Sequence, residues 1–106
     1  MRWLYHVMTA DSPFDDPYSP PSLAQEGFVH CSYRDAVEES ARLYFPPRAA
    51  LRVLQIDPRR LACEVRVAET PRGPMPHVHG AIPRAAVARI LMMNQLADAP
   101  DVIGSG

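Results

Sequence analysis

Short strand-like segments dominate this sequence, and only one stretch has the pattern of a substantial helix. Aromatic, β-branched and alternating apolar residues predict strands at 3–8, 27–32, 51–56, 63–69 and 87–93. One apolar stripe predicts a helix at 33–45. Strands and helices do not alternate as in βαβ units, and the sequence contains neither GxGxxG nor a phosphate-binding loop. The sequence therefore predicts an α+β fold rather than a doubly wound parallel sheet.

The length and charge limit the number of domains and the kinds of partner. With 106 residues the chain is expected to form one domain over 1–98, followed by a flexible tail over 99–106. A formal net charge of −1 argues against nucleic acid and anionic membranes as partners. No apolar run reaches the roughly 20 residues of a membrane-spanning helix. The N-terminus lacks the apolar stretch of a signal peptide, and Cys31 and Cys63 form no CxxC pair. We therefore expect a cytoplasmic protein with free thiols, while the sequence leaves a disulfide open.

Capping residues and turn residues set the expected ends of the elements. Ser22 and Ser32 are expected to cap a helical turn at 22–26 and the helix at 33–45. The apolar stripe of the longer helix consists of Ala36, Val37, Ala41, Tyr44 and Phe45. The near-continuous apolar run at 51–56 is typical of a strand covered on both faces. The proline-rich segments 9–21 and 70–76 are expected to be loops.

All four histidines lie in segments with strand or strand-edge character: His6, His30, His77 and His79. An imidazole can serve as acid, base, hydrogen-bond partner or metal ligand near neutral pH. We therefore expect imidazoles from three strand segments to share a cleft. Successive residues of a strand point to opposite faces, so Phe28, His30 and Ser32 share one face and should line this cleft. Val29 and Cys31 should point into the core.

Several alternatives to this cleft stay open at the level of sequence. His30 could instead bond a neighbouring backbone group, and His6 could be an ordinary core histidine. His77 and His79 form an HxH pair that could ligate a metal together with His6 or His30. No carboxylate or thiolate stands at firm ligand spacing beside them, so we predict no metal site. Cys31 is not expected to act as a nucleophile with His30, because adjacent strand residues face apart.

Glu69 is a candidate carboxylate for the cleft. It continues the alternation of Cys63, Val65 and Val67, which are expected to face inward. A carboxylate at this position either enters the cleft or meets solvent where the strand ends. Inside the cleft it could stabilise a developing positive charge.

Four segments together resemble the small bacterial family labelled domain of unknown function 952. In the order of the family, they are residues 5–7, 21–32, 51–61 and 76–83. That family has been grouped with the ADP-ribosyltransferase fold. The resemblance therefore implies two short mixed or antiparallel sheets that enclose an NAD-binding cleft, with one main helix.

This resemblance implies an ADP-ribosyltransferase-like enzyme that binds NAD, as a substrate, or a related ribosyl phosphate. His6 would bond the dinucleotide, while His30 and His77 would orient ribose and phosphate or pass protons. Glu69 would support the ribosyl cation. The candidate binding residues are Ser22, Phe28, Ser32 and His79. The alternatives are a non-catalytic module that binds a nucleotide or small anion, and a histidine metal site that supports hydrolysis.

Overall fold

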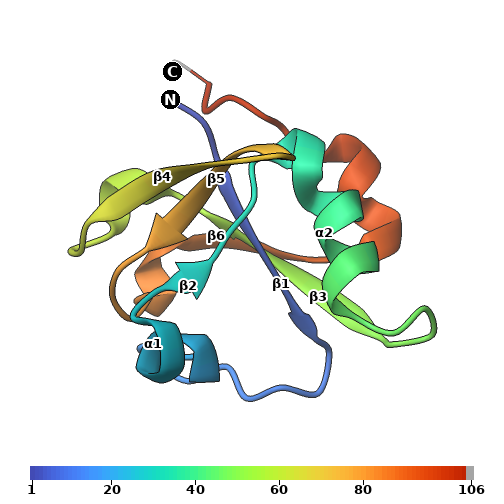
Figure 1. Cartoon of the computed structure of the whole chain (residues 1–106), viewed down its shortest axis with the longest axis horizontal. Helices are drawn as coiled ribbons and strands as arrows, with labels where there is room; N and C mark the ends of the chain where they lie inside the picture. The colour runs from blue at the N-terminus through green and yellow to red at the C-terminus, as the bar shows by residue number, and fades with distance from the viewer. Residues whose placement is uncertain (105–106) are drawn as a thin grey trace.

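The structure, a computed structural model, describes residues 1–104 and contains two three-stranded antiparallel sheets (Figure 1). The first sheet has the order β1-β3-β6 and consists of β1 (Leu4–Thr9), β3 (Leu51–Ile56) and β6 (Val87–Met92). The second has the order β2-β5-β4 and consists of β2 (Val29–His30), β5 (Gly73–Val78) and β4 (Val65–Thr70). The main helix is α2 (Val37–Tyr44), and α1 (Pro21–Glu26) is shorter. The predicted α+β class is confirmed.

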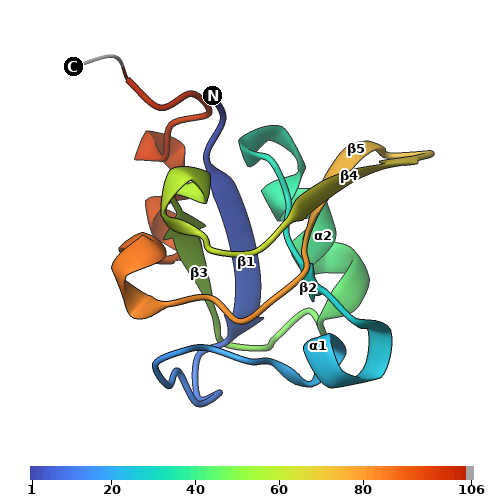
Figure 2. The same ribbon diagram turned by 90° about the vertical axis from the view of Figure 1, so that its left-hand side faces the viewer.

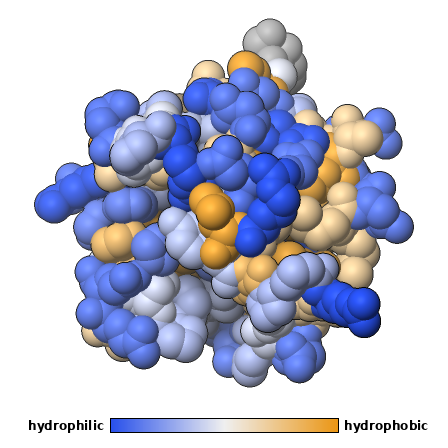
Figure 3. All heavy atoms as spheres, turned by 45° about the vertical axis from the view of Figure 1, so that its right-hand side comes forward, coloured by the Kyte–Doolittle hydropathy of each residue, from blue (hydrophilic) through white to orange (hydrophobic). Residues whose placement is uncertain are grey.

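Short 3₁₀ segments connect these elements: η1 (Arg34–Ala36), η2 (Pro58–Arg60), η3 (Arg84–Ala86) and η4 (Met93–Asp98). Among residues 1–104, no helix is long and apolar enough to cross a membrane. The face of the molecule in Figure 3 is mainly hydrophilic and carries apolar patches among charged side chains.

The first sheet has an apolar core on each of its faces. Leu54 packs with Val29 and Val78, so one core lies between the two sheets. Val53 packs on the opposite face with Val37 of α2. Figure 2 shows β1 and β3 in one layer and β4 and β5 in another. Burying one such side chain stabilises the folded state by about 1.5–3 kcal/mol. Since β3 places buried side chains in both cores, the hydrophobic stability of the fold depends strongly on this strand. The prediction that this strand is covered on both faces is confirmed.

The segment 70–76 is not a loop but the turn of a hairpin and most of β5. β5 is the middle strand of its sheet although it contains Pro74 and Pro76. His79 N donates to Glu64 O at 2.8 Å on the β4 side, whereas Pro76 O accepts from Cys31 N at 3.1 Å on the β2 side. Backbone groups alternate in direction along a strand, so both prolines turn their nitrogens away from β4. The β4–β5 ladder therefore loses no hydrogen bond to proline, and the predicted loop is wrong.

Ser32 joins the two sheets instead of capping the helix. Its backbone exchanges two hydrogen bonds with Tyr5, at 2.8 and 2.7 Å, and its hydroxyl lies 2.8 Å from the hydroxyl of Ser40. The helical segment that follows has Tyr33 at its N-cap, without a side-chain cap bond. Ser22 likewise lies inside α1, whose N-cap is Pro20. Both capping predictions are wrong: the helical segment begins one residue later than predicted, so Tyr33 rather than Ser32 is at its N-cap, and the Ser32 hydroxyl pairs with Ser40 instead.

The main helix buries a different stripe from the one predicted. The helical segment starts as 3₁₀ in η1 and continues as α2, which ends two residues before Pro46. Val37, Ser40 and Ala41 are its buried positions, whereas Tyr44 is 62% exposed. Tyr44 extends toward the β4–β5 hairpin, where its hydroxyl accepts a hydrogen bond from Arg72 at 3.0 Å. An exposed aromatic ring at this helix end is therefore available for contacts outside the core.

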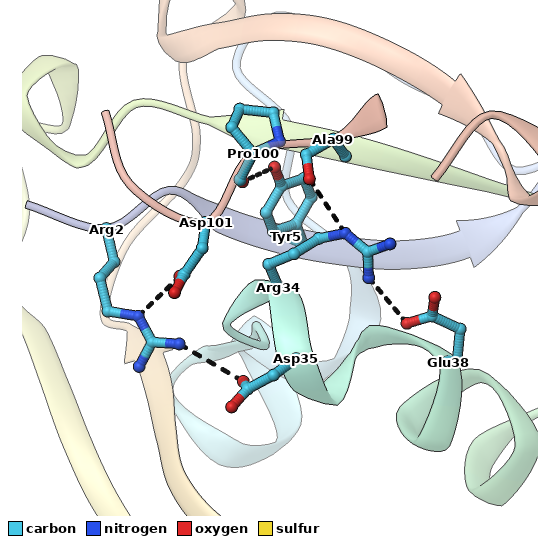
Figure 4. A network of polar contacts seen from close by, with 8 residues as sticks. All are labelled: Arg2, Tyr5, Arg34, Asp35, Glu38, Ala99, Pro100 and Asp101. Carbon is cyan, nitrogen blue, oxygen red and sulfur yellow. Dashed lines mark hydrogen bonds and ion pairs between the residues drawn. The ribbon is translucent and has the colours of Figure 1, made fainter. Parts of the chain in front are cut away.

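Residues 99–103 are bound to the N-terminal strand (Figure 4). Tyr5 donates its hydroxyl proton to Pro100 O, and Arg2 Nε donates to Asp101 at 2.8 Å. Arg34 donates to the carbonyl of Ala99 at 3.1 Å, and Ala99 itself is buried. Residues 99–103 of the segment expected to be a flexible tail therefore make hydrogen bonds to the N-terminal part of the chain. Residues 105–106 of the expected tail lie outside the described residues.

Candidate functional site

A pocket of about 310 Å³ opens between α2, the middle of β1, the end of β2, and the β4–β5 hairpin. Its volume is at the lower end of the range of roughly 300–1,000 Å³ that is usual for ligand sites. The lining residues are His6, Val7, His30, Cys31, Ser32, Ser40, Tyr44, Phe45, Thr70, Arg72, Met75 and His77. Apolar and aromatic side chains therefore share this wall with one guanidinium, three imidazoles and the hydroxyls of two serines, one threonine and one tyrosine.

His6 contributes a fully satisfied ring to the pocket wall. Its Nδ1 donates to His30 O at 2.7 Å, and its Nε2 accepts from the hydroxyl of Tyr18 at 2.9 Å. The residue is only 8% exposed, and this burial lowers the pKa of the imidazole to about 4. Neither nitrogen is free for a ligand or a proton transfer. The geometry agrees with the alternative of a core histidine rather than with the dinucleotide contact implied by the resemblance.

His30 and His77 occupy directly paired positions of β2 and β5, so their side chains lie on one face of the sheet. Their ring centroids are 5.7 Å apart. The His77 ring stacks on Phe28 at 3.9 Å and 14°. Burial, together with the neighbouring His30 and His79, lowers the pKa of His77. The predicted meeting of imidazoles from separate strands is present for this pair.

Glu26 holds the ring of His30 from outside the pocket. The carboxylate stands at the end of α1, and it accepts a hydrogen bond from His30 Nε2. Gly27 follows α1 with φ of 86°, in the left-handed region, so the chain can turn sharply between Glu26 and β2. A carboxylate on Nε2 favours the tautomer that carries its proton there and leaves Nδ1 as an acceptor. The Nδ1 atom of His30 is therefore left with a lone pair that can accept a proton.

Arg72 is the pocket residue that sequence reasoning missed. It lies in the β4–β5 turn. The Thr70 hydroxyl closes this turn by donating to Gly73 O and accepting from Arg72 N. Its guanidinium donates to Tyr44 at 3.0 Å and to Ser40 at 3.3 Å, and Glu39 lies 3.6 Å away. The proline and glycine around it suggested a loop, and that expectation hid a hairpin tip that returns to α2. The alternating strand before Pro71 and the glycine after Arg72 were the signal for a hairpin.

Glu69 does not reach the pocket. It pairs with Pro74, on the face of the sheet opposite to Met75 and His77. Val65, four residues before Glu69 on the same face of β4, packs into the core between the sheets, but the strand extends beyond this core. Val67 is consequently 48% exposed, and Glu69 is also exposed. The predicted alternation is correct, and the pocket lies on the other side.

The remaining candidates divide between the pocket and its surroundings. Ser32 lines the pocket, whereas Ser22 in α1 does not. Phe28 lies behind the histidine pair, with its ring 5.5 Å from that of His79. Cys31 reaches the wall, but burial raises the pKa of its thiol to about 12, so a thiolate nucleophile is disfavoured. Within residues 1–104, no three His, Cys, Asp or Glu side chains are grouped so that they could hold a metal ion.

Comparison with known proteins identifies a family and a fold. A crystal structure of protein CC0527 from Caulobacter crescentus, a structural genomics target, matches with a TM-score of 0.72 and 18% identity, over 85% of this chain and 84% of that chain. A double mutant of CC0527 matches with the same TM-score and coverage and 17% identity. No curated protein matches the sequence. The sequence also matches the family described as protein of unknown function DUF952 over residues 8–90. The chain therefore belongs to the DUF952 family.

Proposed function

We propose that the pocket binds a small phosphorylated ligand of mononucleotide size. The observation that carries this proposal is the position of Arg72, whose guanidinium lies in the same pocket wall as two imidazoles and an apolar floor. The Arg72 side chain is 21% exposed, so it is partly shielded from water but open to a ligand. A guanidinium offers parallel donors that match the oxygens of a phosphate.

The other lining residues suit the two ends of such a ligand. Beside Arg72, the Ser40 hydroxyl can donate a further hydrogen bond to a phosphate oxygen when Ser32 donates to it. Tyr44, Phe45 and Met75 in the same wall offer apolar and aromatic surface for a base or sugar. Few polar groups placed among apolar side chains are typical of small-molecule sites.

The volume and the carboxylates favour binding over glycosyl transfer. At about 310 Å³ the pocket suits one nucleotide better than the two of NAD. A transferase would also need a carboxylate beside the ribosyl cation, and Glu69 lies on the opposite face of its sheet. We therefore propose a nucleotide-binding domain, with NAD as the larger ligand to be tested against it.

Calorimetric titration tests this proposal with AMP, adenosine, inorganic phosphate and NAD. We expect AMP to bind at least about tenfold more tightly than adenosine, because hydrogen bonds to a charged group contribute about 1.5–3 kcal/mol. Arg72→Gln should weaken AMP binding about 10- to 100-fold and leave adenosine nearly unaffected. Arg89→Gln, in β6 and outside the pocket wall, is the matched control for charge. No saturable binding at millimolar AMP, or equal AMP binding by Arg72→Gln and wild type, would falsify the proposal.

A further inference from the structure

The pocket combines two imidazoles in different environments with a cation. His30 receives a carboxylate partner on Nε2, whereas His77 stacks on Phe28. The two rings meet at 75°, with 5.7 Å between their centroids. They come from directly opposed residues of β2 and β5, so the sheet fixes their separation. One phosphate group can contact both rings at once, through different oxygens.

The pocket offers acid–base groups but no activated side-chain nucleophile. The hydroxyls of Ser32 and Ser40 bond each other at 2.8 Å, and Arg72 donates to Ser40. The raised pKa of the Cys31 thiol keeps it protonated. A reaction that needs only a base, an acid and a cation is one in which the substrate carries its own nucleophile. A phosphodiester next to a ribose 2′-hydroxyl is such a substrate.

We infer that His30 and His77 cleave small ribonucleotide phosphodiesters, with Glu26 as the positioning residue of His30 and Arg72 as the contact to the phosphate. This inference rests on the proposed binding of a phosphorylated ligand. The nucleoside with the reacting 2′-hydroxyl occupies the pocket, and the leaving alcohol extends into solvent. The net charge of −1 favours short diesters over nucleic acid polymers.

The step balances without a further reactant. His30 Nδ1 takes the proton of the 2′-hydroxyl, the O2′–P bond forms and the P–O bond to the leaving alcohol breaks. The leaving oxygen takes a proton from protonated His77, and the products are a 2′,3′-cyclic phosphate and an alcohol. The pKa of His77 is lowered by burial, so its proton is given up readily, and the bound phosphate favours the protonated ring. Solvent then restores both imidazoles.

Two substrates with different leaving groups test the separate roles of the histidines. Uridine 3′-(4-nitrophenyl phosphate) releases a phenolate that needs no acid, whereas uridylyl-(3′→5′)-adenosine releases an alkoxide that does. We expect wild type to cleave both, and His30→Ala to lower kcat about 10²- to 10³-fold on both. His77→Ala should lower kcat similarly on the dinucleotide and less than about threefold on the nitrophenyl ester. Bis(4-nitrophenyl) phosphate, which lacks a 2′-hydroxyl, should stay intact.

Glu26→Gln tests positioning by a split between kinetic constants. It should lower kcat about tenfold while KM stays unchanged, because the carboxylate orients His30 without touching the substrate. His30→Ala keeps the carbonyl that bonds His6, and His30→Gln is a second variant should alanine fail to fold. Variants purified in the same way as wild type control for contaminating ribonuclease.

The outcomes separate this inference from the proposed function. If uridine 3′-phosphate binds in the calorimeter and both diesters stay intact, the cleavage is wrong while the binding site stands. If uridine 3′-phosphate and AMP both fail to bind, the proposed function fails first. Cleavage that persists in His30→Ala and in His30→Gln also overturns the inference.

Discussion

The two sheets of this protein differ in regularity, in burial and in what they carry. In the first sheet, β1, β3 and β6 have six residues each, and β3 is buried on both faces. In the second sheet, β2 has two residues, β5 contains two prolines, and β4 extends beyond the core. Only β1 of the first sheet contributes residues to the pocket wall, whereas the hairpin and β2 of the second contribute several.

The histidines of the two sheets differ accordingly in whether their imidazoles can react. His6, on the first sheet, is enclosed by Tyr18 and the carbonyl of His30, and it serves the fold. His30 and His77, on the second sheet, stay partly open to the pocket. Burial and complete hydrogen bonding stabilise a structure, but they remove the free lone pair that chemistry needs. The regular first sheet therefore mainly stabilises the fold, and the irregular second sheet provides most of the candidate site.

Truncating an apolar side chain should destabilise the first sheet far more than the second. Leu54→Ala in β3 should lower the free energy of unfolding by about 2–5 kcal/mol, because it leaves a cavity between the sheets. Val67→Ala in β4 should change it by less than about 1 kcal/mol, since Val67 is 48% exposed. Urea unfolding measures both values. Similar losses of unfolding free energy for the two variants would contradict the view that the first sheet stabilises the fold more than the second.

The second effect concerns the pH dependence of stability. The pKa of His6 is about 4 in the folded protein, against about 6.5 when unfolded. Between these values the unfolded chain binds a proton that the folded protein excludes, so stability is complete near pH 7 and falls as the pH drops toward 4. The full loss is about 3 kcal/mol. Urea unfolding of wild type and His6→Gln between about pH 7 and 4.5 tests this, and equal pH slopes would contradict it.

The same contrast explains how much of the fold the sequence could predict. The strands of the first sheet follow from apolar runs at 3–8, 51–56 and 87–93. In β1 and β3 this pattern reflects burial on both faces, whereas most residues of β6 are exposed. β5 was missed, since Pro74 and Pro76 normally exclude a middle strand. They are tolerated because β2 is too short to pair beside Pro74, a property of the assembled sheet that no local pattern contains.

The alternation of side chains along a strand predicted only part of the pocket wall. The placement of His30 and Ser32 in the pocket follows from their shared face on the strand. The same rule correctly grouped Glu69 with Val65 and Val67, but alternation does not tell which face meets a pocket. The closing partner of His6 is Tyr18, which lies in an irregular segment where spacing gives no contact information.

A smaller effect tests how the first sheet is tied to residues 99–103. Tyr5→Phe removes the hydrogen bond to Pro100 O and should cost about 1 kcal/mol of unfolding free energy. It should also speed hydrogen exchange at the Trp3 amide, which donates to Asp101 O at 2.9 Å. Tyr33→Phe is the matched control, because its ring packs under the Arg2 guanidinium and this contact does not use the hydroxyl. Equal exchange rates at Trp3 in Tyr5→Phe and wild type would show that residues 99–103 are held by other contacts.

The smallest effect belongs to the second sheet and concerns anion binding at the histidine pair. Sulfate keeps its charge between about pH 5 and 8, so a change in its affinity reports the protein. The pKa of His77 is lowered by burial, His30 and His79, and Glu26 opposes them, so at pH 7 the ring is mostly neutral. A bound anion favours the protonated ring, and binding should therefore take up a proton. Sulfate should bind about threefold more tightly near pH 5.5 than near pH 7.5, and this change should be smaller in His77→Gln. Calorimetry at both pH values measures this, with Arg72→Gln to confirm that sulfate occupies the pocket.

If sulfate affinity is constant or falls at low pH, the second sheet holds its histidines as neutral packing groups, and the contrast with His6 disappears.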